Sequence, residues 1–324
     1  MAQLRVASLF AGCGGMDLGV RGGFKFNGKK YPRLNTEVLH ASDFDDRVVN
    51  IYNLNFDHEA SVQDINFLIS KKLPKIDLIL GGFPCQSFSV VAQNPRRLGF
   101  KDSKGQLFFE MKRLLEEKKP LAFIAENVKG ILSANKGEAF PLIIEEFEKA
   151  GYHVKYALLN ASHFGVPQKR ERVFIVGFRK KKNFQKFTFP VPTTLGNPVP
   201  LGKFLEPEHL VEEKYFFSKK AVDGMKNSKN SVLMNKGRIQ KLGEPSNTLG
   251  AHLAKVSLNS TDPVLRIDNR YRMFTPREVA RIQSFPEEFK LVDQRSHNYI
   301  ALGNAVPPVL MWHVSNAVVN ALES

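Results

Sequence analysis

Short apolar runs alternate with longer amphipathic segments over the first 180 residues of the chain. The amphipathic segments have helical periodicity and include 106–117 and 138–150, the second of which ends at Gly151 in the manner of a helix C-cap. The apolar runs have the length of buried strands, and they fall at 4–10, 38–42, 76–80, 122–125, 156–159 and 173–176. This alternation predicts an α/β fold with a doubly wound, mostly parallel sheet.

The alternation stops at about residue 180, and Pro, Gly, Asn and Lys dominate up to about residue 262. We therefore expect a large domain over 1–179, a smaller, loop-rich, basic unit over 180–285, and a C-terminal segment over 286–324. Thr275 followed by Pro276 and Glu278 predicts a helix that begins with a capping box. An amphipathic helix is expected over 307–322, where the chain returns to the large domain so that its two ends meet.

The charge of the chain points to a polyanionic partner. Its 47 Lys and Arg against 32 Asp and Glu give a formal net charge of +15. Between Arg179 and Lys241 there are 14 basic and 5 acidic residues, a net charge of +9. A nucleic acid is the partner that this excess favours, and a basic surface that only aids solubility is the alternative.

Other features narrow the class of protein. No apolar run reaches the roughly 18 residues of a membrane span, and the first residues lack the regions of a signal peptide. Two cysteines provide no disulfide framework, which fits a reducing compartment. The eight histidines have no metal-ligand spacing. We expect a cytoplasmic protein with no membrane partner and no metal.

The run from Gly81 to Ser87 places a thiol where open α/β sheets hold their chemistry. It follows the apolar stretch 76–80, and its Pro84–Cys85 pair stands just beyond the carboxyl end of that predicted strand. Cys85 is therefore a candidate nucleophile, and a small buried core cysteine is the alternative.

A second loop has the features of a nucleoside site. The glycine-rich stretch 10–15 follows the first strand and opens a helix, which allows a ligand close to the backbone. Asp43 ends the next strand, where an acid can bind both ribose hydroxyls, and Phe44 beside it can stack on adenine. Asp17 replaces the third glycine of a dinucleotide fingerprint, which disfavours a nicotinamide dehydrogenase. Cys13 is interpreted as a small filler in this turn.

Two further groups complete the candidate chemistry. Glu126 ends another predicted strand at the same sheet edge as Cys85, where a carboxyl in a partly apolar site has a raised pKa and can give a proton. Arg170 and Arg172 alternate before the strand at 173–176 and share one face of an extended segment. Taken singly, the acid can be a cap and the arginines salt-bridge partners.

These motifs stand in the order of one known family. The chain resembles the bacterial-type DNA (cytosine-5) methyltransferases at Phe-Ala-Gly-Cys-Gly-Gly (10–15), Gly-Gly-Phe-Pro-Cys-Gln (81–86), Glu-Asn-Val (126–128), Gln-x-Arg-x-Arg (168–172), Arg238 with 244–249, 275–286 and 302–307. The resemblance covers nearly the whole chain and implies methyl transfer from S-adenosyl-L-methionine to carbon 5 of a flipped-out cytosine, with S-adenosyl-L-homocysteine as product.

The resemblance also implies residue roles. Cys85 matches the nucleophile that attacks carbon 6, Glu126 the acid at ring nitrogen 3, and Arg170 the arginine near the base carbonyl, with Arg172 in support. The residues that match the cofactor pocket are Phe10, Ala11, Gly12, Cys13, Gly14, Gly15, Asp43, Phe44, Asp64, Ile65, Pro84, Leu107, Asn304, Ala305 and Val306.

The same resemblance implies double-stranded DNA as substrate. Segment 90–104 is expected to close over the target, and residues 180–262 match the family's target-recognition region. The expected DNA contacts are Gln86, Ser89, Arg96, Arg97, Lys104, Gln168 and Arg238, with Lys219, Lys220, Lys226, Asn227, Lys229, Asn230 and Asn235 as further candidates. The chain is expected to act as a monomer, with a cognate restriction endonuclease as a possible partner. An RNA cytosine-5 methyltransferase and a catalytically silent DNA-binding relative remain the alternatives, and the recognition site stays open.

Overall fold

A seven-stranded sheet forms the centre of the large unit. The computed structural model describes residues 3–83, 106–227, 238–255 and 262–323. The sheet contains, in spatial order, β5 (Ser61–Val62), β4 (Thr36–Asp43), β1 (Leu4–Leu9), β6 (Leu78–Gly81), β7 (Ala122–Val128), β9 (Glu171–Phe178) and β8 (His153–Asn160). The first five strands pair in parallel, whereas β9 is antiparallel to both β7 and β8. The prediction of a doubly wound, mostly parallel α/β sheet is confirmed.

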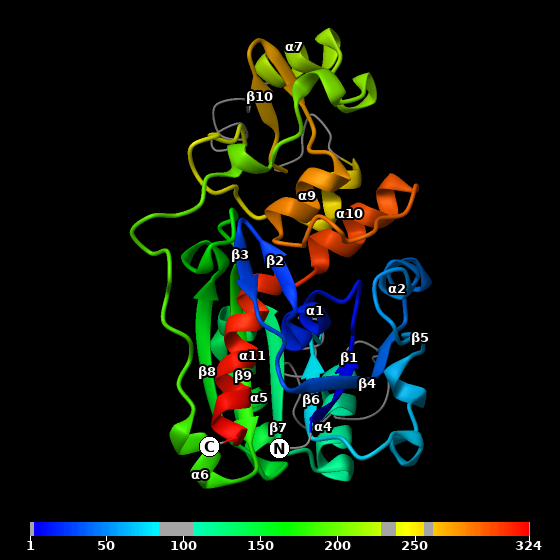
Figure 1. The fold of residues 1–324 in the computed structure, drawn as a ribbon, viewed down its shortest axis with the longest axis vertical. Coiled ribbons are helices and arrows are strands. Elements are labelled where there is room, and N and C mark those ends of the chain that lie inside the picture. The colour runs from blue at the N-terminus through cyan, green and yellow to red at the C-terminus, as the bar shows by residue number, and fades with distance from the viewer. Residues whose placement is uncertain (1–2, 84–105, 228–237, 256–261, 324) are drawn as a thin grey trace.

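Helices cover both faces of this sheet (Figure 1). They are α1 (Gly15–Arg21), α2 (Asp46–Asn53), α4 (Gln106–Lys118), α5 (Ala139–Lys149), α6 (Lys181–Lys186) and α11 (Pro308–Glu323), with 3-10 turns η1 (Ile65–Phe67), η2 (Ser70–Lys72), η5 (Lys129–Gly137) and η6 (Ala161–Phe164) and a hairpin of β2 (Phe24–Phe26) and β3 (Lys29–Tyr31). Alternate residues of β6 enter two cores: Leu78 packs with α1 and α11, and Ile79 packs with α4 and α5. Burial on both faces explains why the central strands are continuous apolar runs.

The two ends of the described chain lie close together. Figure 1 shows both termini at the lower end of the molecule. Leu4, Leu34 and Val319 form a small apolar cluster there, and the Asn35 amide donates to Glu323 Oε1 over 2.7 Å. The C-terminal helix is thus part of the large unit.

The smaller unit has short elements. It contains η7 (Leu201–Phe204), η8 (Glu208–Leu210), η9 (Glu213–Tyr215), α7 (Lys219–Asn227), η10 (Ala251–Lys255), a hairpin of β10 (Leu265–Ile267) and β11 (Arg270–Arg272), α9 (Pro276–Ile282) and α10 (Arg295–Asn304). The predicted capping box of Thr275 and Glu278 is present. The loop-rich composition of this stretch therefore corresponds to a real change of architecture.

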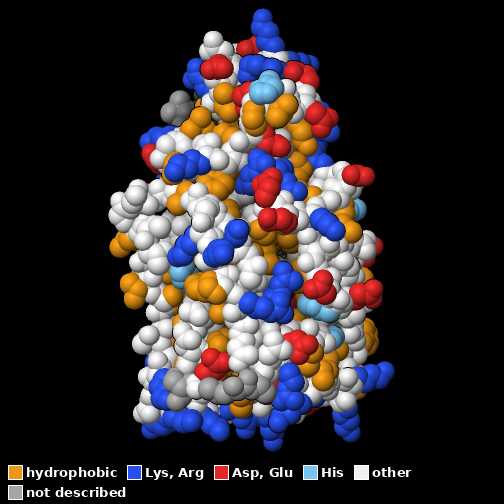
Figure 2. Space-filling model, in the orientation of Figure 1, with side chains coloured by type: hydrophobic (Ala, Val, Ile, Leu, Met, Phe, Trp, Pro, Cys, Tyr) orange, Lys and Arg blue, Asp and Glu red, His pale blue; other side chains and the backbone are white. Residues whose placement is uncertain are grey.

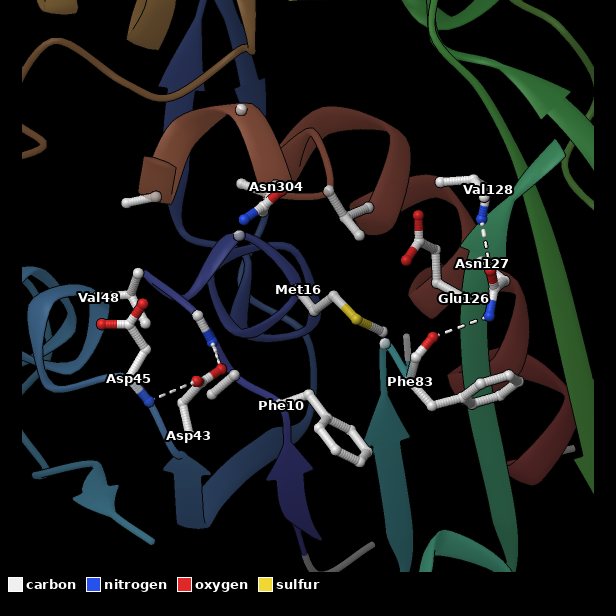
Figure 3. Close-up of a pocket in the computed structure, with 18 of the residues that line it drawn as sticks. Phe10, Met16, Asp43, Asp45, Val48, Phe83, Glu126, Asn127, Val128 and Asn304 are labelled. Carbon is white, nitrogen blue, oxygen red and sulfur yellow. Dashed lines mark hydrogen bonds between the residues drawn. The ribbon is translucent and has the colours of Figure 1, made fainter. Parts of the chain in front are cut away.

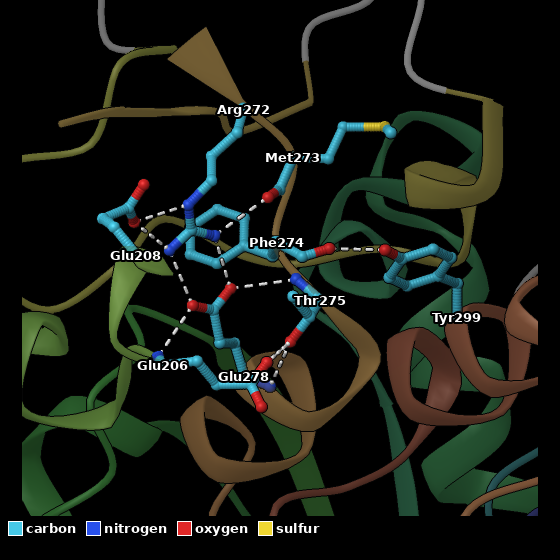
Figure 4. Close-up of polar contacts among 8 residues, drawn as sticks. All are labelled: Glu206, Glu208, Arg272, Met273, Phe274, Thr275, Glu278 and Tyr299. Carbon is cyan, nitrogen blue, oxygen red and sulfur yellow. Dashed lines mark hydrogen bonds and ion pairs between the residues drawn. The ribbon is translucent and has the colours of Figure 1, made fainter. Parts of the chain in front are cut away.

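A buried charged cluster holds several of these short elements together (Figure 4). Arg272 and Glu278 are both fully buried and lie 2.8 Å apart, and Arg272 also pairs with Glu208 of η8. The Tyr299 hydroxyl of α10 donates to the carbonyl of Phe274. An unpaired buried charge is costly, so this pairing fixes how η8, β11 and α9 meet.

The start of the smaller unit differs from the expected residue 180. Asn183 donates to the Ala321 carbonyl of α11 over 3.0 Å, Phe187 packs on Phe178, and Thr193 N–H donates to the His163 carbonyl over 2.8 Å. Residues 181–199 therefore lie along the large unit, and α6 lies at the end of the molecule farthest from α7 (Figure 1). A change in composition marks where regular elements end, and it carries no information on which unit the following loop packs against.

This placement also divides the basic segment. Five of its 14 basic residues fall at 179–186, which leaves 9 basic against 5 acidic residues, a net charge of +4, for 187–241. On the face drawn in Figure 2, basic side chains gather along the lower end of the molecule as well as around the upper end.

Candidate active site

A cavity of about 360 Å³ opens at the carboxyl edge of the sheet (Figure 3). Its wall is built from the segments that follow β1, β4 and β6, from the end of β7, from the start of α1 and from residues 301–306. Parallel strands bring their carboxyl ends to one edge, which is where open α/β sheets bind ligands. Of the predicted cofactor residues, those that line it are Phe10, Ala11, Gly12, Gly15, Asp43, Phe44, Leu107, Asn304, Ala305 and Val306.

The glycine loop is held to the neighbouring strand by Asp43. The N–H groups of Gly12 and Asp45 donate to the two carboxyl oxygens of Asp43 over 2.9 and 3.1 Å. Gly12 has φ +56°, a backbone conformation that glycine adopts without strain. Burial raises the pKa of Asp43, and the backbone donors oppose that rise. Phe44 is 72% exposed at the rim and leaves an aromatic face free.

The C-terminal segment forms the opposite wall of the cavity, and it packs directly against the start of α1. A Cβ atom on Gly15 would lie only 2.4 Å from the Val306 carbonyl oxygen. Glycine at this position thus permits the contact between the start of α1 and residues 304–306.

Four of the expected cofactor residues lie elsewhere. Cys13 is buried in the core, where burial raises its pKa to about 12, in keeping with its interpretation as a filler. Gly14 is the N-cap of α1. Asp64 is exposed and caps η1 by accepting from the Asn66 N–H. Ile65 packs in the core on the α4 and α5 face of the sheet. None of these four lines the cavity in the described part of the chain.

Glu126 is a buried acid with an arginine against it. The residue is 8% exposed at the end of β7, and Arg172 Nε lies 2.9 Å from Oε1. Burial raises the pKa of Glu126, and the charges of Arg172 and Arg170 only partly offset the rise. A Cβ on Gly82 would stand 3.4 Å from Oε2, so this carboxyl faces the segment that leads to Cys85. Such a group is suited to hold and donate a proton.

The neighbouring residue ties two strand ends together. The Asn127 side chain donates to the Phe83 carbonyl over 2.8 Å and accepts from the Val128 N–H over 2.9 Å (Figure 3). It therefore fixes the end of β6 beside the end of β7, two residues before Cys85.

The two arginines make different contacts. Arg170 is fully buried, and it donates from Nη1 to the Leu249 carbonyl over 3.2 Å and from Nη2 to the Gly303 carbonyl over 2.9 Å. Arg172 is the one that pairs with Glu126. Both line the cavity; Arg172 lies beside the acid, whereas Arg170 is engaged by backbone carbonyls.

Two expected DNA contacts are also buried. Gln168 is fully buried and its Oε1 accepts from the Leu249 N–H over 3.1 Å. Arg238 is 3% exposed, with Nε donating to the Asp262 carbonyl over 2.8 Å. Their polar groups hold backbone in place, and a motif alone does not reveal that burial. The remaining calls at Pro84, Cys85, Gln86, Ser89, Arg96, Arg97 and Lys104 lie outside the described residues.

Sequence reasoning missed part of the cavity wall: Met16, Asp45, Val48, Gly82, Phe83, Asn127, Val128, Ala301 and Gly303. Gly82, Phe83, Asn127, Val128 and Gly303 lie within the family motifs themselves, so membership of a motif was the available signal for these five. Across the described ranges, no group of three His, Cys, Asp or Glu is placed to hold a metal, and no helix is long and apolar enough to cross a membrane.

The sheet order, the helices on both faces and the cavity at the carboxyl edge define the fold of S-adenosylmethionine-dependent methyltransferases. Solved structures share it: the Entamoeba histolytica methyltransferase EhMeth at a TM-score of 0.77 and 17% identity, covering 100% of both chains, and the S. pombe Dnmt2 methyltransferase at 0.75 and 21%, covering 99% of both. At these identities the likeness concerns the fold.

Sequence comparison narrows the class. The family model for C-5 cytosine-specific DNA methylases matches residues 4–320, and the chain belongs to this family. Similar relatives include the Type II methyltransferase M1.ScrFI of Lactococcus lactis subsp. cremoris, 34% identical over 99% of this chain and 79% of that protein. The Type II methyltransferase M.Bsp6I of Bacillus sp. is 35% identical over 94% and 95%. The protein is therefore a DNA cytosine-5 methyltransferase.

Proposed function

We propose that this enzyme takes the methyl group of S-adenosyl-L-methionine and transfers it through a covalent Cys85 adduct to a cytosine extruded from duplex DNA. The observation that carries the proposal is the Glu126–Arg172 pair on the wall of the cavity, facing the segment that leads to Cys85. Acid, arginine and cofactor loop thus share one cavity.

The cavity residues fit the expected cofactor. A volume of about 360 Å³ is within the range of small-molecule sites. In this proposal the backbone of 10–15 approaches the ligand closely, Asp43 receives the ribose hydroxyls, and Phe44 stacks on the adenine. S-adenosyl-L-methionine would supply a sulfonium methyl group and leave as S-adenosyl-L-homocysteine.

The chain's own residues would then activate the ring. The Cys85 thiolate adds to carbon 6 of cytosine, and the electron pair moves toward carbon 5 as an enamine. Glu126 donates a hydrogen bond or its proton to ring nitrogen 3, which offsets the negative charge that develops there. After carbon 5 is methylated, loss of its proton expels Cys85 and restores the aromatic ring.

Arg172 would keep this acid in position and reach the base carbonyl. Its ion pair to Oε1 leaves Oε2 on the side of Gly82. Because carbons 5 and 6 are hidden in a duplex, the target base must leave the stack to meet these groups.

The proposed setting is a Type II restriction-modification system, as the names of the relatives suggest. The enzyme would act as a monomer in the cytoplasm and protect one duplex site from a cognate restriction endonuclease. Bisulfite sequencing of DNA treated with the purified protein would identify that site.

The covalent step is tested with a duplex that carries 5-fluorocytosine at the modified position. The wild-type protein should become covalently attached in the presence of S-adenosyl-L-methionine, because fluorine cannot leave as a proton does. Cys85→Ser should bind the duplex and not be trapped, whereas Cys13→Ala, at the buried second cysteine, should still be trapped. Absence of trapping in the wild type, or methylation of transfer RNA in place of duplex DNA, would refute the proposal.

A further inference from the structure

Arg170 is a buried cation whose hydrogen bonds go to backbone. It is fully buried and has no salt bridge within 4.0 Å among the described residues, and its Nε lacks an acceptor there. Burying a charge is costly unless it is paired and hydrogen-bonded, and within the described part of the chain Arg170 has only the hydrogen bonds. Its two other nitrogens donate to carbonyls that are 79 and 133 residues away along the chain.

The first carbonyl belongs to a segment that we call the strap, residues 246–251. The strap runs beside residues 167–170 and is bound to them repeatedly. Ser246 N–H donates to the Pro167 carbonyl over 2.9 Å, and Lys169 N–H donates to the Ser246 carbonyl over 2.7 Å. The Thr248 hydroxyl donates to the Lys169 carbonyl over 2.8 Å. The strap is therefore fixed to the segment that carries both arginines.

The strap also belongs to the smaller unit. Its Asn247 N–H donates to Gln240 Oε1 over 2.7 Å, and Gln240 N–H donates to the Val264 carbonyl over 3.0 Å next to the β10–β11 hairpin. At its other end the strap continues into η10. A displacement of the smaller unit would thus be transmitted to the strap.

The second carbonyl belongs to the wall of the cavity. Gly303 and the three residues after it line the cavity, and Val306 lies against Gly15. A Cβ on Gly303 would stand 2.2 Å from the Ala251 nitrogen and 2.3 Å from the Gly250 carbonyl carbon. Strap and wall therefore meet backbone to backbone, with Arg170 bridging them.

We infer that Arg170 is a positioning residue that couples the smaller unit to the cofactor cavity, so that binding of duplex DNA and binding of cofactor strengthen each other through the strap. This inference rests on the proposed function for the identity of the two ligands. One guanidinium sets the spacing of two carbonyls, because its donors stand in a rigid fork. A ligand that orders either segment thereby orders the other, and such coupling is reciprocal.

The test measures binding, with S-adenosyl-L-homocysteine and a duplex carrying the methylated site as probes. Wild-type affinity for S-adenosyl-L-homocysteine should rise by about 5-fold or more when the duplex is present. Arg170→Lys keeps the charge and loses the forked donors of the guanidinium. We therefore expect the ratio of S-adenosyl-L-homocysteine affinities with and without duplex to fall toward 1, and the KM for S-adenosyl-L-methionine to rise about 10-fold. Arg172→Lys should instead lower kcat and retain the enhancement.

Gly303→Ala tests the contact between the strap and the cavity wall without changing any charge. If Arg170→Lys does not fold, Gly303→Ala alone tests the coupling. Alanine favours the helix in which Gly303 stands, but its methyl group enters the strap, so the enhancement should again be lost. Gly250→Ala is the matched control, because a Cβ there meets no atom of the described residues within 4 Å. The inference is overturned if the wild type shows no enhancement, if a folded Arg170→Lys retains it, or, where Arg170→Lys does not fold, if Gly303→Ala retains it. Failure of Cys85 trapping alone would refute the proposed chemistry and leave this coupling intact.

Discussion

Asp17 is a carboxyl that the fold buries completely in the first turn of α1. It accepts hydrogen bonds from the Ser8 hydroxyl over 2.8 Å and the Tyr52 hydroxyl over 2.9 Å, and Tyr52 is also hydrogen-bonded to His58 Nε2 over 2.7 Å. Burial raises the pKa of Asp17 to about 6, and the two hydroxyl donors limit the rise. The position where the sequence lacks a third glycine is thus a buried acid beneath the cofactor loop.

This raised pKa predicts how stability changes with pH. Since the folded pKa lies above the unfolded value of 3.8, the contribution of Asp17 is fully present below that value and is lost as pH rises through about 6. Between pH 4.5 and 7.5 the wild type should lose on the order of 2 kcal/mol of unfolding free energy relative to Asp17→Asn. Urea unfolding at both pH values measures this. The exposed Asp57→Asn should follow the wild type, and a pH-independent difference for Asp17→Asn would contradict the assignment.

Glu126 carries the second prediction at this scale. Glu126→Gln preserves the shape of the side chain and removes its proton, so methyl transfer under single-turnover conditions should slow by roughly 100-fold or more. Duplex binding should change little, because the residue lies in the cavity wall. A near-normal transfer rate would show that another group protonates the base.

At the scale of elements, the contact between α1 and the C-terminal segment shapes the cavity that we propose binds the cofactor. Gly15→Ala would place a methyl group about 2.4 Å from the Val306 carbonyl oxygen, so the wall formed by 304–306 must move away. We expect the affinity for S-adenosyl-L-homocysteine, measured by calorimetry, to fall by about 10-fold, which is about 1.4 kcal/mol. Gly130→Ala is the control, because among the described residues a Cβ there would have only the Val128 side chain within reach, at 4.0 Å. Unchanged affinity in Gly15→Ala would mean that residues 304–306 can move away without weakening ligand binding.

The elements themselves could be predicted wherever local pattern decides. The apolar run at 76–80 became β6, Glu138–Ala150 became α5 with Gly151 at φ +89°, and the Thr275 capping box formed as its spacing requires. The antiparallel insertion of β9 between β7 and β8 was not predicted, because strand order depends on tertiary pairing.

The position of the cavity could be predicted from the motifs, and its internal contacts only in part. Motif order identified Glu126 and the glycine loop, and the cavity contains them. The contacts of Arg170 could not be predicted from the sequence, because the carbonyls that engage it lie at Leu249 and Gly303, far away in the sequence. Gln168 and Arg238 illustrate the same limit, since a polar residue type does not say whether its partner is DNA or buried backbone.

At the scale of the whole molecule, the two units leave basic residues at opposite ends. Lys219 and Lys220 are exposed on α7 at the upper end, whereas Lys181 and Lys182 are exposed on α6 at the lower end (Figures 1 and 2). The sequence alone assigned all four to one recognition region. The fold separates them, and only the α7 pair belongs to the smaller unit.

This separation yields a prediction about duplex binding. Phosphate contacts release counterions, so affinity for a duplex carrying the site should fall by about 10³-fold between 50 and 200 mM salt if about six phosphates are contacted. Lys219→Gln combined with Lys220→Gln should reduce the slope of log K against log salt by up to about 2, since each phosphate contact contributes about 0.9. Lys181→Gln combined with Lys182→Gln removes the same charge from the far end and should leave the slope unchanged, because α6 packs against the C-terminal helix away from the smaller unit. Equal losses in both double variants would mean that the duplex responds to net charge alone, and a reduced slope only in the α6 variant would place the duplex at the opposite end of the molecule.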